Sequence, residues 1–298
     1  MTIFYAVLII LGALILSYGI WCLAEPFFLD LDRAVLKDTH EDRASFNDIS
    51  VKSLPLIPED IQDDPDVRLF FISDIHSEWC PVSAKRICSA IEKCHKSAPL
   101  DAVIFGGDIA SRAHNAAGGF KYLRKISDCC KELGIPFYGV CGNHDYTIAT
   151  NAPAASGFIG LDNKVTEMTS HKSGAKISLA GHPNSGRHNR VWQQTLPEGS
   201  REPVILVAHD PEALIHIDPS DRPAFMLSGH LHGGQMKLPF RLQFTALRKA
   251  DCMPKYGVVQ GCYNIMGTSV FVSRGLGCGV LPVRFLSVPE ATVVEIHL

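Results

Sequence analysis

The chain has 298 residues, 46% of them hydrophobic, which is enough to bury the core of one large or two ordinary domains. Its net charge is −3 and it has no basic block, so its composition does not favour a nuclease. Its ten cysteines contain no Cys-x-x-Cys pair, which argues against zinc ribbons and fingers and favours buried, reduced thiols.

The N-terminal stretch from Ile3 to Leu23 is almost wholly apolar, and the first charge after it is Glu25. About 20 apolar residues span a hydrocarbon core, so we predict a transmembrane helix. A cleaved signal peptide is less favoured, because a basic leader region and a small-x-small cleavage site are both missing. We expect a single-pass membrane protein with an anchor at residues 1–25.

Basic residues follow this helix and none precedes it, since Arg33, Lys37 and Arg43 all lie on its C-terminal side. The positive-inside rule therefore places the body of the protein in the cytoplasm. We interpret residues 26–66 as a tether and a lead-in strand at Ile49–Leu54, and residues 67–298 as the main domain.

Apolar runs then alternate with helical patterns, which is typical of βαβ units. The predicted strands are Val67–Ile72, Asp101–Phe105 and Ile135–Val140, and the predicted helices are Val82–Lys96 and Gly118–Leu133. Each strand delivers polar residues at its carboxyl end, namely Asp74 and His76, Asp108, and Asn143, His144 and Asp145. Because parallel strands bring these ends to one edge of a sheet, we expect the three sets to lie side by side.

The second half contains short apolar runs with little helix between them, which indicates a second sheet. The predicted strands are Lys176–Ala180, Pro203–Ala208, Ala224–Ser228, Ser269–Ser273 and Ala291–Ile296. His209 follows the second of these runs, and His230 and His232, flanked by glycines, follow the third.

These carboxylate, amide and imidazole groups suffice to bind two divalent ions, with Asp108 on the middle strand as the natural bridge. Two adjacent ions clamp a phosphate and generate hydroxide, so we predict phosphoester hydrolysis. Manganese is the expected metal, with iron, zinc or cobalt as alternatives that the ligand types also accept.

The ordered motifs resemble those of the calcineurin-like metallophosphoesterases. They are Asp74-x-His76, Gly107-Asp108, Gly142-Asn143-His144-Asp145, His209 and Gly229-His230-x-His232. The resemblance implies an α/β fold, a four-layer α/β/β/α sandwich. Further similarity to the membrane-associated bacterial branch comes from His232-Gly233-Gly234-Gln235 and from Ser273-Arg274-Gly275-Leu276-Gly277 with Pro282, Arg284, Pro289 and Glu290. That branch includes UDP-2,3-diacylglucosamine hydrolases of lipid A synthesis.

The resemblance also implies roles for individual residues. One metal would be bound by Asp74, His76, Asp108 and His232, and the other by Asp108, Asn143, His209 and His230. His144 would protonate the leaving oxygen or stabilise the transferred phosphoryl group, and Arg112 would bind the phosphate. Many members carry an acidic residue that orients the catalytic histidine at the position of Ser111, and here Asp145 is a substitute for that function.

Simpler interpretations exist for single residues. Asp74 and Asp108 could each cap a helix, but capping does not explain the paired His230 and His232. We expect His114, His171, His182 and His188 to lie on the surface. The stretch from Leu238 to Lys249 mixes apolar and basic residues, and we expect its apolar groups to pack into the second sheet. The alternative is a flap that takes an acyl chain or rests on a membrane.

The sequence therefore predicts a membrane-anchored binuclear enzyme that hydrolyses a phosphodiester or pyrophosphate bond with a metal-bridging hydroxide. Its expected partners are the bilayer and a phosphoester or lipid-linked nucleotide such as UDP-2,3-diacylglucosamine, with no nucleic acid. The alternatives are an outward-facing phosphodiesterase of cell-wall or generic substrates, a protein phosphatase, a nuclease and a non-catalytic metal-binding scaffold.

Overall fold

The computed structural model describes residues 2–61, 63–170, 172–184 and 192–298. These residues form four α-helices, which are α1 (Thr2–Ala24), α2 (Ala84–Ser97), α3 (Ala116–Glu132) and α4 (Ala152–Ser156). They also form thirteen strands, which are β1 (Asp30–Lys37), β2 (Val51–Leu54), β3 (Val67–Ile72), β4 (Ala102–Phe105), β5 (Phe137–Gly139), β6 (Ile159–Gly160), β7 (Lys164–Thr169), β8 (Lys176–His182), β9 (Val204–Ala208), β10 (Phe225–Ser228), β11 (Gly261–Ile265), β12 (Thr268–Val272) and β13 (Glu290–His297).

The first sheet has the strand order β1-β13-β3-β4-β5-β6. Strands β3 to β6 are parallel neighbours, and α2 and α3 connect β3 to β4 and β4 to β5, as the βαβ pattern predicts. Side chains alternate between the two faces of β3. Leu69 and Phe71 point toward the second sheet, whereas Phe70 and Ile72 pack under the helices.

The second sheet has the order β2-β11-β12-β10-β9-β8-β7, with β8, β9, β10 and β12 parallel and antiparallel strands at both edges. It packs against the first sheet through a shared apolar core that includes Phe71, Ile104, Leu227 and Phe271. Phe71 and Phe271 meet edge to face across this core, with ring centroids 6.0 Å apart.

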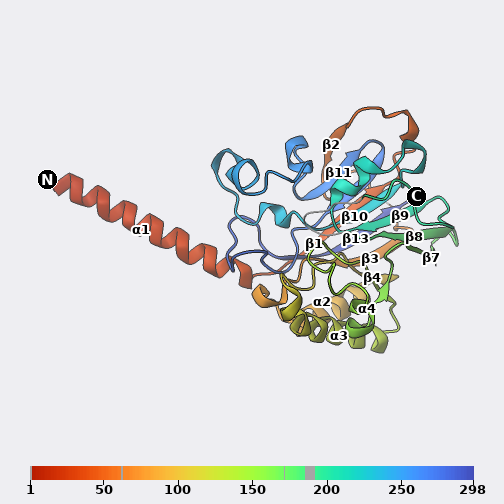
Figure 1. The fold of residues 1–298 in the computed structure, drawn as a ribbon, viewed down its shortest axis with the longest axis horizontal. Coiled ribbons are helices and arrows are strands. Elements are labelled where there is room, and N and C mark those ends of the chain that lie inside the picture. Colours follow the sequence, from red (N-terminus) through yellow and green to blue (C-terminus); the bar gives the residue numbers. More distant parts are fainter. Residues whose placement is uncertain (1, 62, 171, 185–191) are drawn as a thin grey trace.

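The expected four-layer α/β arrangement is confirmed. Helices α2, α3 and α4 lie together on the outer face of the first sheet (Figure 1). The outer face of the second sheet is covered, in the described residues, by 3₁₀ turns and loops rather than by long helices. Leu214, from the 3₁₀ segment Pro211–His216, and Met253 pack there against strand residues such as Leu206 and Met226.

The structure corrects two expectations about where segments lie in the fold. Residues 30–37 are not a tether but strand β1, which pairs along its whole length with β13. Its charges looked like those of a linker, yet Arg33 binds Glu295 of the neighbouring strand, at 2.5 Å. The run Ala291–Ile296, expected in the second sheet, is part of β13 and lies in the first sheet between β1 and β3. The strand expected at Ile49–Leu54 exists as β2.

Helix α1 projects from one end of the domain (Figure 1). The span Phe4–Phe27 has a mean hydropathy of 2.4 and is long and apolar enough to cross a membrane, a character that signal sequences share. Its described side chains are exposed along almost the whole helix, and burial begins only at Cys22 and Glu25 near the domain.

Candidate metal centre

The structure brings all the predicted site residues to the carboxyl ends of central strands from both sheets. Asp74 and His76 follow β3, Asp108 follows β4, Asn143 and His144 follow β5, His209 follows β9, and His230 and His232 follow β10. The adjacent loops are tied together by backbone hydrogen bonds, such as that from the amide of Asp74 to the carbonyl of Gly107, at 2.8 Å. The site therefore rests on the rigid middle of the fold.

Strained backbone marks these loops. Five of the predicted site residues have positive φ angles, between 40° and 69°: Asp74, His76, Asp108, His230 and His232. Residues with a Cβ rarely adopt this conformation, which persists at functional sites where the surroundings enforce it. Close packing is one such constraint, because a Cβ at Gly142 would meet the carboxylate of Asp108, and one at Gly229 would meet that of Asp74.

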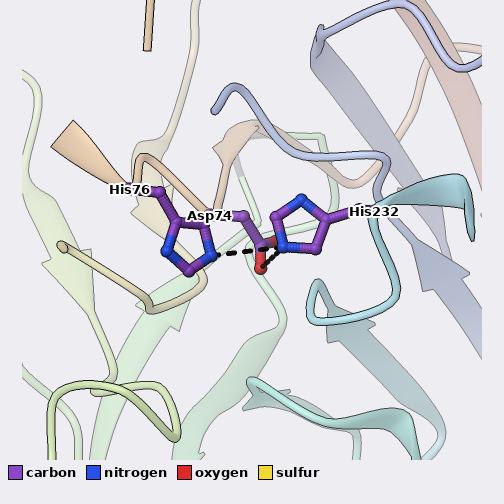
Figure 2. Close-up of side chains that lie close together, drawn as sticks. All are labelled: Asp74, His76 and His232. Carbon is purple, nitrogen blue, oxygen red and sulfur yellow. Dashed lines mark hydrogen bonds and ion pairs between the residues drawn. The ribbon is translucent and has the colours of Figure 1, made fainter. Parts of the chain in front are cut away.

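Asp74, His76 and His232 form the first group that could hold a metal ion. Figure 2 shows the two imidazole rings on opposite sides of the Asp74 side chain. The Nε2 atoms of His76 and His232 lie 3.2 Å apart, and Nε2 of His232 lies 3.4 Å from Oδ1 of Asp74. All three side chains are buried, so their ring nitrogens and carboxylate converge on one point away from bulk water.

Asp108 connects this group to a second one. Its Oδ2 atom lies 3.4 Å from Nε2 of His76 and 3.3 Å from Nε2 of His209. Asp74, Asp108 and His209 form another group with metal-ligating spacing. The carboxylate of Asp108 thus stands between two sets of histidines, which is the position that a bridging ligand requires.

Asn143 extends the second group. Its Oδ1 atom lies 3.2 Å from Nε2 of His209 and 2.9 Å from Nδ1 of His230. On the far side of the ring, Nε2 of His230 lies 3.5 Å from Asp210 and 3.5 Å from Asp251. Arg248 also lies 3.3 Å from this Nε2, so charged groups of both signs fix the ring with its Nδ1 turned toward Asn143.

These two acidic neighbours were not predicted from the sequence. Asp210 directly follows His209, and that position is the only signal that could have identified it. Asp251 comes from a distant loop, where Arg248 binds it at 2.6 Å and also reaches the carbonyl of His230 at 3.0 Å. Only the tertiary structure brings this pair to the site.

The electrostatics of the cluster favour positive charge at its centre. Burial alone would raise the pKa of Asp108, but His209, His144 and His76 reverse this and hold it well below its usual range. Burial alone would lower the pKa of His209, yet the carboxylates of Asp108 and Asp74 raise it to about 10. Burial lowers the pKa of His76 to about 4, so that ring is a neutral metal-type ligand at pH 7.

A backbone carbonyl orients His144. Nδ1 of His144 lies 2.8 Å from the carbonyl oxygen of Ser111, and its Nε2 lies 4.0 Å from Oδ2 of Asp108. The carboxylate of Asp145, the expected substitute, instead accepts hydrogen bonds from the amides of Asp108, Ile109 and Gly142. That hypothesis was wrong, because the Asp145 carboxylate binds the backbone of the loops that follow β4 and β5.

The hydroxyl of Ser111 has a separate contact. It donates a hydrogen bond to the carbonyl of Gly279, at 3.0 Å, and lies 3.1 Å from Nδ1 of His76. The hydroxyl can therefore accept from the Nδ1–H of His76, which leaves the Nε2 lone pair facing Asp108. His209 is oriented in the same way, with Nδ1 2.7 Å from the carbonyl of Gly106.

A cavity of about 260 Å³ opens beside the cluster, lined by Glu78, Trp79, Ser111, Arg112, Asn115, His144, Gly279 and Val280. Arg112 is exposed at this opening, and Glu78 accepts hydrogen bonds from the backbone amides of Ser111 and Arg112, at 3.0 and 3.2 Å. The cavity gives a ligand access to His144 from solvent.

Other sequence expectations fared differently. In the segment 238–249, Phe244 is buried, but Phe240, Leu242 and Leu247 are exposed, so packing into the second sheet was wrong for these three. His114 is exposed as expected. His182 is not on the surface, because it closes β8 and is only 3% exposed, while His171 and His188 lie outside the described residues.

Comparison with known proteins agrees with this geometry. The family described as Calcineurin-like phosphoesterase matches residues 67–234. The chain is 32% identical over 204 residues to the uncharacterized metallophosphoesterase YkuE of Bacillus subtilis, covering 65% of this chain and 66% of that protein. It is 28% identical to the uncharacterized protein YpbG of the same organism, over 85% of this chain and 89% of that one. It is 24% identical to the phosphodiesterase YaeI of Escherichia coli, over 77% of this chain and 82% of that one.

Proposed function

The chain belongs to the calcineurin-like phosphoesterase family, and on this basis we propose that it is a membrane-anchored phosphodiesterase that uses two divalent metal ions. Membership makes it a metallophosphoesterase, and its clustered histidines and aspartates are able to bind metal. The observation that carries the proposal is the position of Asp108, whose Oδ2 lies within 3.4 Å of both His76 and His209.

The ligand sets follow from the two groups that Asp108 joins. One ion would be bound by Asp74, His76, Asp108 and His232, and the other by Asp108, Asn143, His209 and His230. The donors are oxygen and nitrogen only, which suits manganese and also accepts iron, cobalt or zinc. When bound, two such ions supply a hydroxide nucleophile at neutral pH and neutralise charge on the phosphoryl oxygens.

The remaining residues act on the substrate itself. With its Nδ1 held by the carbonyl of Ser111, His144 turns Nε2 toward the cluster, where it donates a proton to the leaving oxygen. Arg112 lies at the opening of the cavity, where its guanidinium meets the phosphate. The chain's own contribution is thus to hold the phosphoester between an acid and a cation.

We further propose that α1 anchors the protein in the membrane and that its substrate is lipid-linked, with UDP-2,3-diacylglucosamine as the first candidate. Only the 3₁₀ turn Glu25–Phe27 and two further residues separate α1 from β1, so the site would stay close to the bilayer. Residues 1–25 form the anchor in this proposal, and the catalytic domain begins at Asp30 rather than at residue 67. The basic residues after α1 favour a cytoplasmic domain.

The test is hydrolysis by metal-stripped full-length protein that is given back Mn²⁺. Bis(p-nitrophenyl) phosphate and UDP-2,3-diacylglucosamine are offered side by side, with Asn143→Ala as the test variant and Asn151→Ala, an exposed asparagine before α4, as the matched control. Manganese-dependent turnover of the lipid nucleotide, lost only in Asn143→Ala, supports the proposal.

Turnover of the simple diester alone would support the phosphodiesterase activity and reject UDP-2,3-diacylglucosamine as the substrate. The favoured alternative would then be an outward-facing enzyme that hydrolyses cell-wall esters. Failure of both substrates with every divalent metal offered would favour a non-catalytic scaffold.

A further inference from the structure

The end of α1 is fixed to one loop of the catalytic domain. This loop, residues 279–287, is called the anchor loop below. The fully buried carboxylate of Glu25 accepts hydrogen bonds from the amides of Leu286 and Ser287, at 2.9 and 2.5 Å. The amide of Arg284 donates to the carbonyl of Cys22 at 3.0 Å, so the loop is hydrogen-bonded to the end of the helix at three points.

The same loop forms part of the candidate active site. Gly279 and Val280 line the cavity that contains His144. The hydroxyl of Ser287 donates to the carbonyl of His232, at 2.6 Å. A single short loop therefore joins the apolar helix to the opening of the site and to one of its histidines.

The anchor loop displays apolar side chains to the outside. Leu281 is 60% exposed and Leu286 is 57% exposed, and Phe27 and Phe28 are exposed next to them at the end of α1. Leu286 also has a φ of 55°, a costly backbone conformation for a leucine whose side chain is more than half exposed. Backbone strain of this kind is found at positions where function favours the conformation.

Several polar backbone groups of the anchor loop are hydrogen-bonded within the protein. The side chain of Gln235 donates to the carbonyls of Leu281 and Val283, at 2.9 and 3.0 Å, and accepts from the amide of Gly279, at 2.9 Å. Internally satisfied backbone groups lower the cost of bringing a loop against the apolar edge of a bilayer.

A second apolar segment continues from the anchor loop. Met236 forms a bridge with Phe285, and the chain then enters the segment 238–249, in which Phe240 is 92% and Leu247 is 77% exposed. The exposed cations Arg241 and Lys249 stand in the same segment. Figure 1 shows these blue and dark-blue loops at the end of the domain from which α1 projects.

We infer that this end of the domain rests in the headgroup layer of the bilayer that α1 crosses, and that the site takes the phosphoester of an acylated lipid at that surface. The contact residues are Phe27, Phe28, Phe240, Leu247, Leu281 and Leu286. Apolar side chains with flanking cations suit a surface of lipid tails and anionic headgroups. The inference rests on the proposed phosphodiesterase and adds the surface through which its lipid-linked substrate reaches the site.

The orientation follows from the connections already described. Because α1 has no flexible tether, crossing the bilayer brings the anchor loop against the headgroups. Val280 then lies at the point where the cavity meets the lipid surface. A lipid phosphoester can enter beside His144 while its acyl chains stay in the membrane.

The first experiment measures how deeply the anchor loop enters the bilayer, and its readout does not depend on enzyme activity. Full-length protein is reconstituted into phosphatidylcholine and phosphatidylglycerol vesicles with brominated acyl chains, which quench tryptophan. Leu281→Trp is compared with Ile159→Trp, an exposed apolar position on β6 at the opposite edge of the first sheet from β1. We expect the fluorescence added by Leu281→Trp to be quenched and that added by Ile159→Trp to persist. Equal fluorescence from both variants overturns the docking.

The second experiment separates lipid access from chemistry. Phosphatidyl-p-nitrophenol in vesicles is compared with soluble bis(p-nitrophenyl) phosphate, which shares its leaving group. The double variant Leu281→Ser/Leu286→Asn keeps α1 and stays in the vesicle, but it loses the contact that turns the cavity toward the lipid. Its rate on the vesicle substrate should fall about tenfold or more, and its soluble rate should stay within about twofold. An equal loss on both substrates, or no loss, overturns the assigned lipid surface.

The two proposals fail in different ways. Unsubstituted protein that hydrolyses neither substrate refutes the phosphodiesterase, while quenching still decides whether the domain docks. The remaining outcome is that the protein hydrolyses only the soluble diester while its Leu281→Trp variant is quenched. This result would reject the lipid substrate and still support docking of the domain on the bilayer.

Discussion

Nδ1 of His144 lies 2.8 Å from the carbonyl oxygen of Ser111, so the ring that faces the candidate metal cluster is oriented by the backbone. A carbonyl is present whatever side chain occupies position 111. The absence of an acidic residue there therefore does not remove the orientation of His144. The contact with the carbonyl makes Nδ1–H the hydrogen-bond donor. Nε2 is then the atom of the ring that exchanges a proton with the substrate.

We predict that the loss of turnover caused by His144→Asn depends on the leaving group of the substrate. A diester with an alkyl leaving group needs a proton from the enzyme, so its turnover should fall by roughly 10²- to 10⁴-fold. Bis(p-nitrophenyl) phosphate releases a stable anion and should lose much less. Steady-state rates on both substrates, with saturating Mn²⁺, measure the difference. Equal losses on the two esters would mean that His144 is not the acid.

Ser111→Ala should weaken metal binding by roughly tenfold, because the hydroxyl that lies 3.1 Å from Nδ1 of His76 orients that ring. Titration of metal-stripped protein with Mn²⁺ by calorimetry measures the affinity. Ser83→Ala is the matched control, since Ser83 caps α2 through the amide of Arg86 and its loss costs stability, about 1 kcal/mol, rather than metal affinity. Unchanged affinity in Ser111→Ala would assign its hydroxyl to loop structure alone.

Divalent metal should stabilise the fold, because binding to the native state alone adds about 2.7 kcal/mol at a concentration of one hundred times Kd. For a domain of this size the expected rise in Tm is roughly 5–10 °C. Asp108→Asn removes the carboxylate shared by both groups and should abolish the rise. Differential scanning calorimetry with and without Mn²⁺ gives the result independently of any substrate. A full rise in the variant would exclude Asp108 as a bridging ligand.

Glu25→Gln should loosen the junction between α1 and the domain. Glu25 accepts hydrogen bonds from Leu286 and Ser287, and an amide at this position presents a donor to one of them. We expect hydrogen exchange at these two amides to accelerate by about tenfold, with no change in the amides of β4. Mass spectrometry of the full chain in micelles resolves both peptides. Unchanged exchange would show that other contacts, such as that between the rings of Tyr18 and Phe285, secure the junction without the Glu25 carboxylate.

Acid should destabilise the protein through His182. Burial lowers its pKa from 6.5 to about 4, so the unfolded chain binds the proton more readily. Stability is unaffected by this group above about pH 6.5, falls as the pH drops from 6.5 toward 4, and levels off below about pH 4 after a loss of about 3 kcal/mol. His182→Gln should show a shallower decline in denaturant midpoint between pH 7 and pH 4.5. An identical decline would assign the acid sensitivity to other groups.

The sequence predicted the parts of this fold that depend on local pattern. The run Val67–Ile72 is strand β3 to the residue, and the spacing of Asp74, Asp108 and Asn143 placed them at neighbouring strand ends. Hydrophobic periodicity and turn residues carry this information, because they are set by the elements themselves.

What the sequence did not predict depends on contacts between distant segments. The mixed polar and apolar pattern after α1 predicts a tether, whereas in the fold Asp32 of strand β1 binds Arg274 at 2.6 Å. The contact of Ser111 with His76 and the position of Asp251 beside His230 likewise exist only after folding. Metal-type residues could be found by their chemistry, but the groups that orient them could not.

The pairing of β1 with β13 has a consequence for biosynthesis. The register joins Asp30 to Glu290 and Lys37 to His297, and β13 alone separates β1 from β3. The first sheet therefore stays open in the nascent chain until its last strand leaves the ribosome. At about 5–20 residues per second, β1 waits on the order of 10–50 s for its partner. An anchor inserted early would hold this unpaired strand at the membrane surface throughout that time.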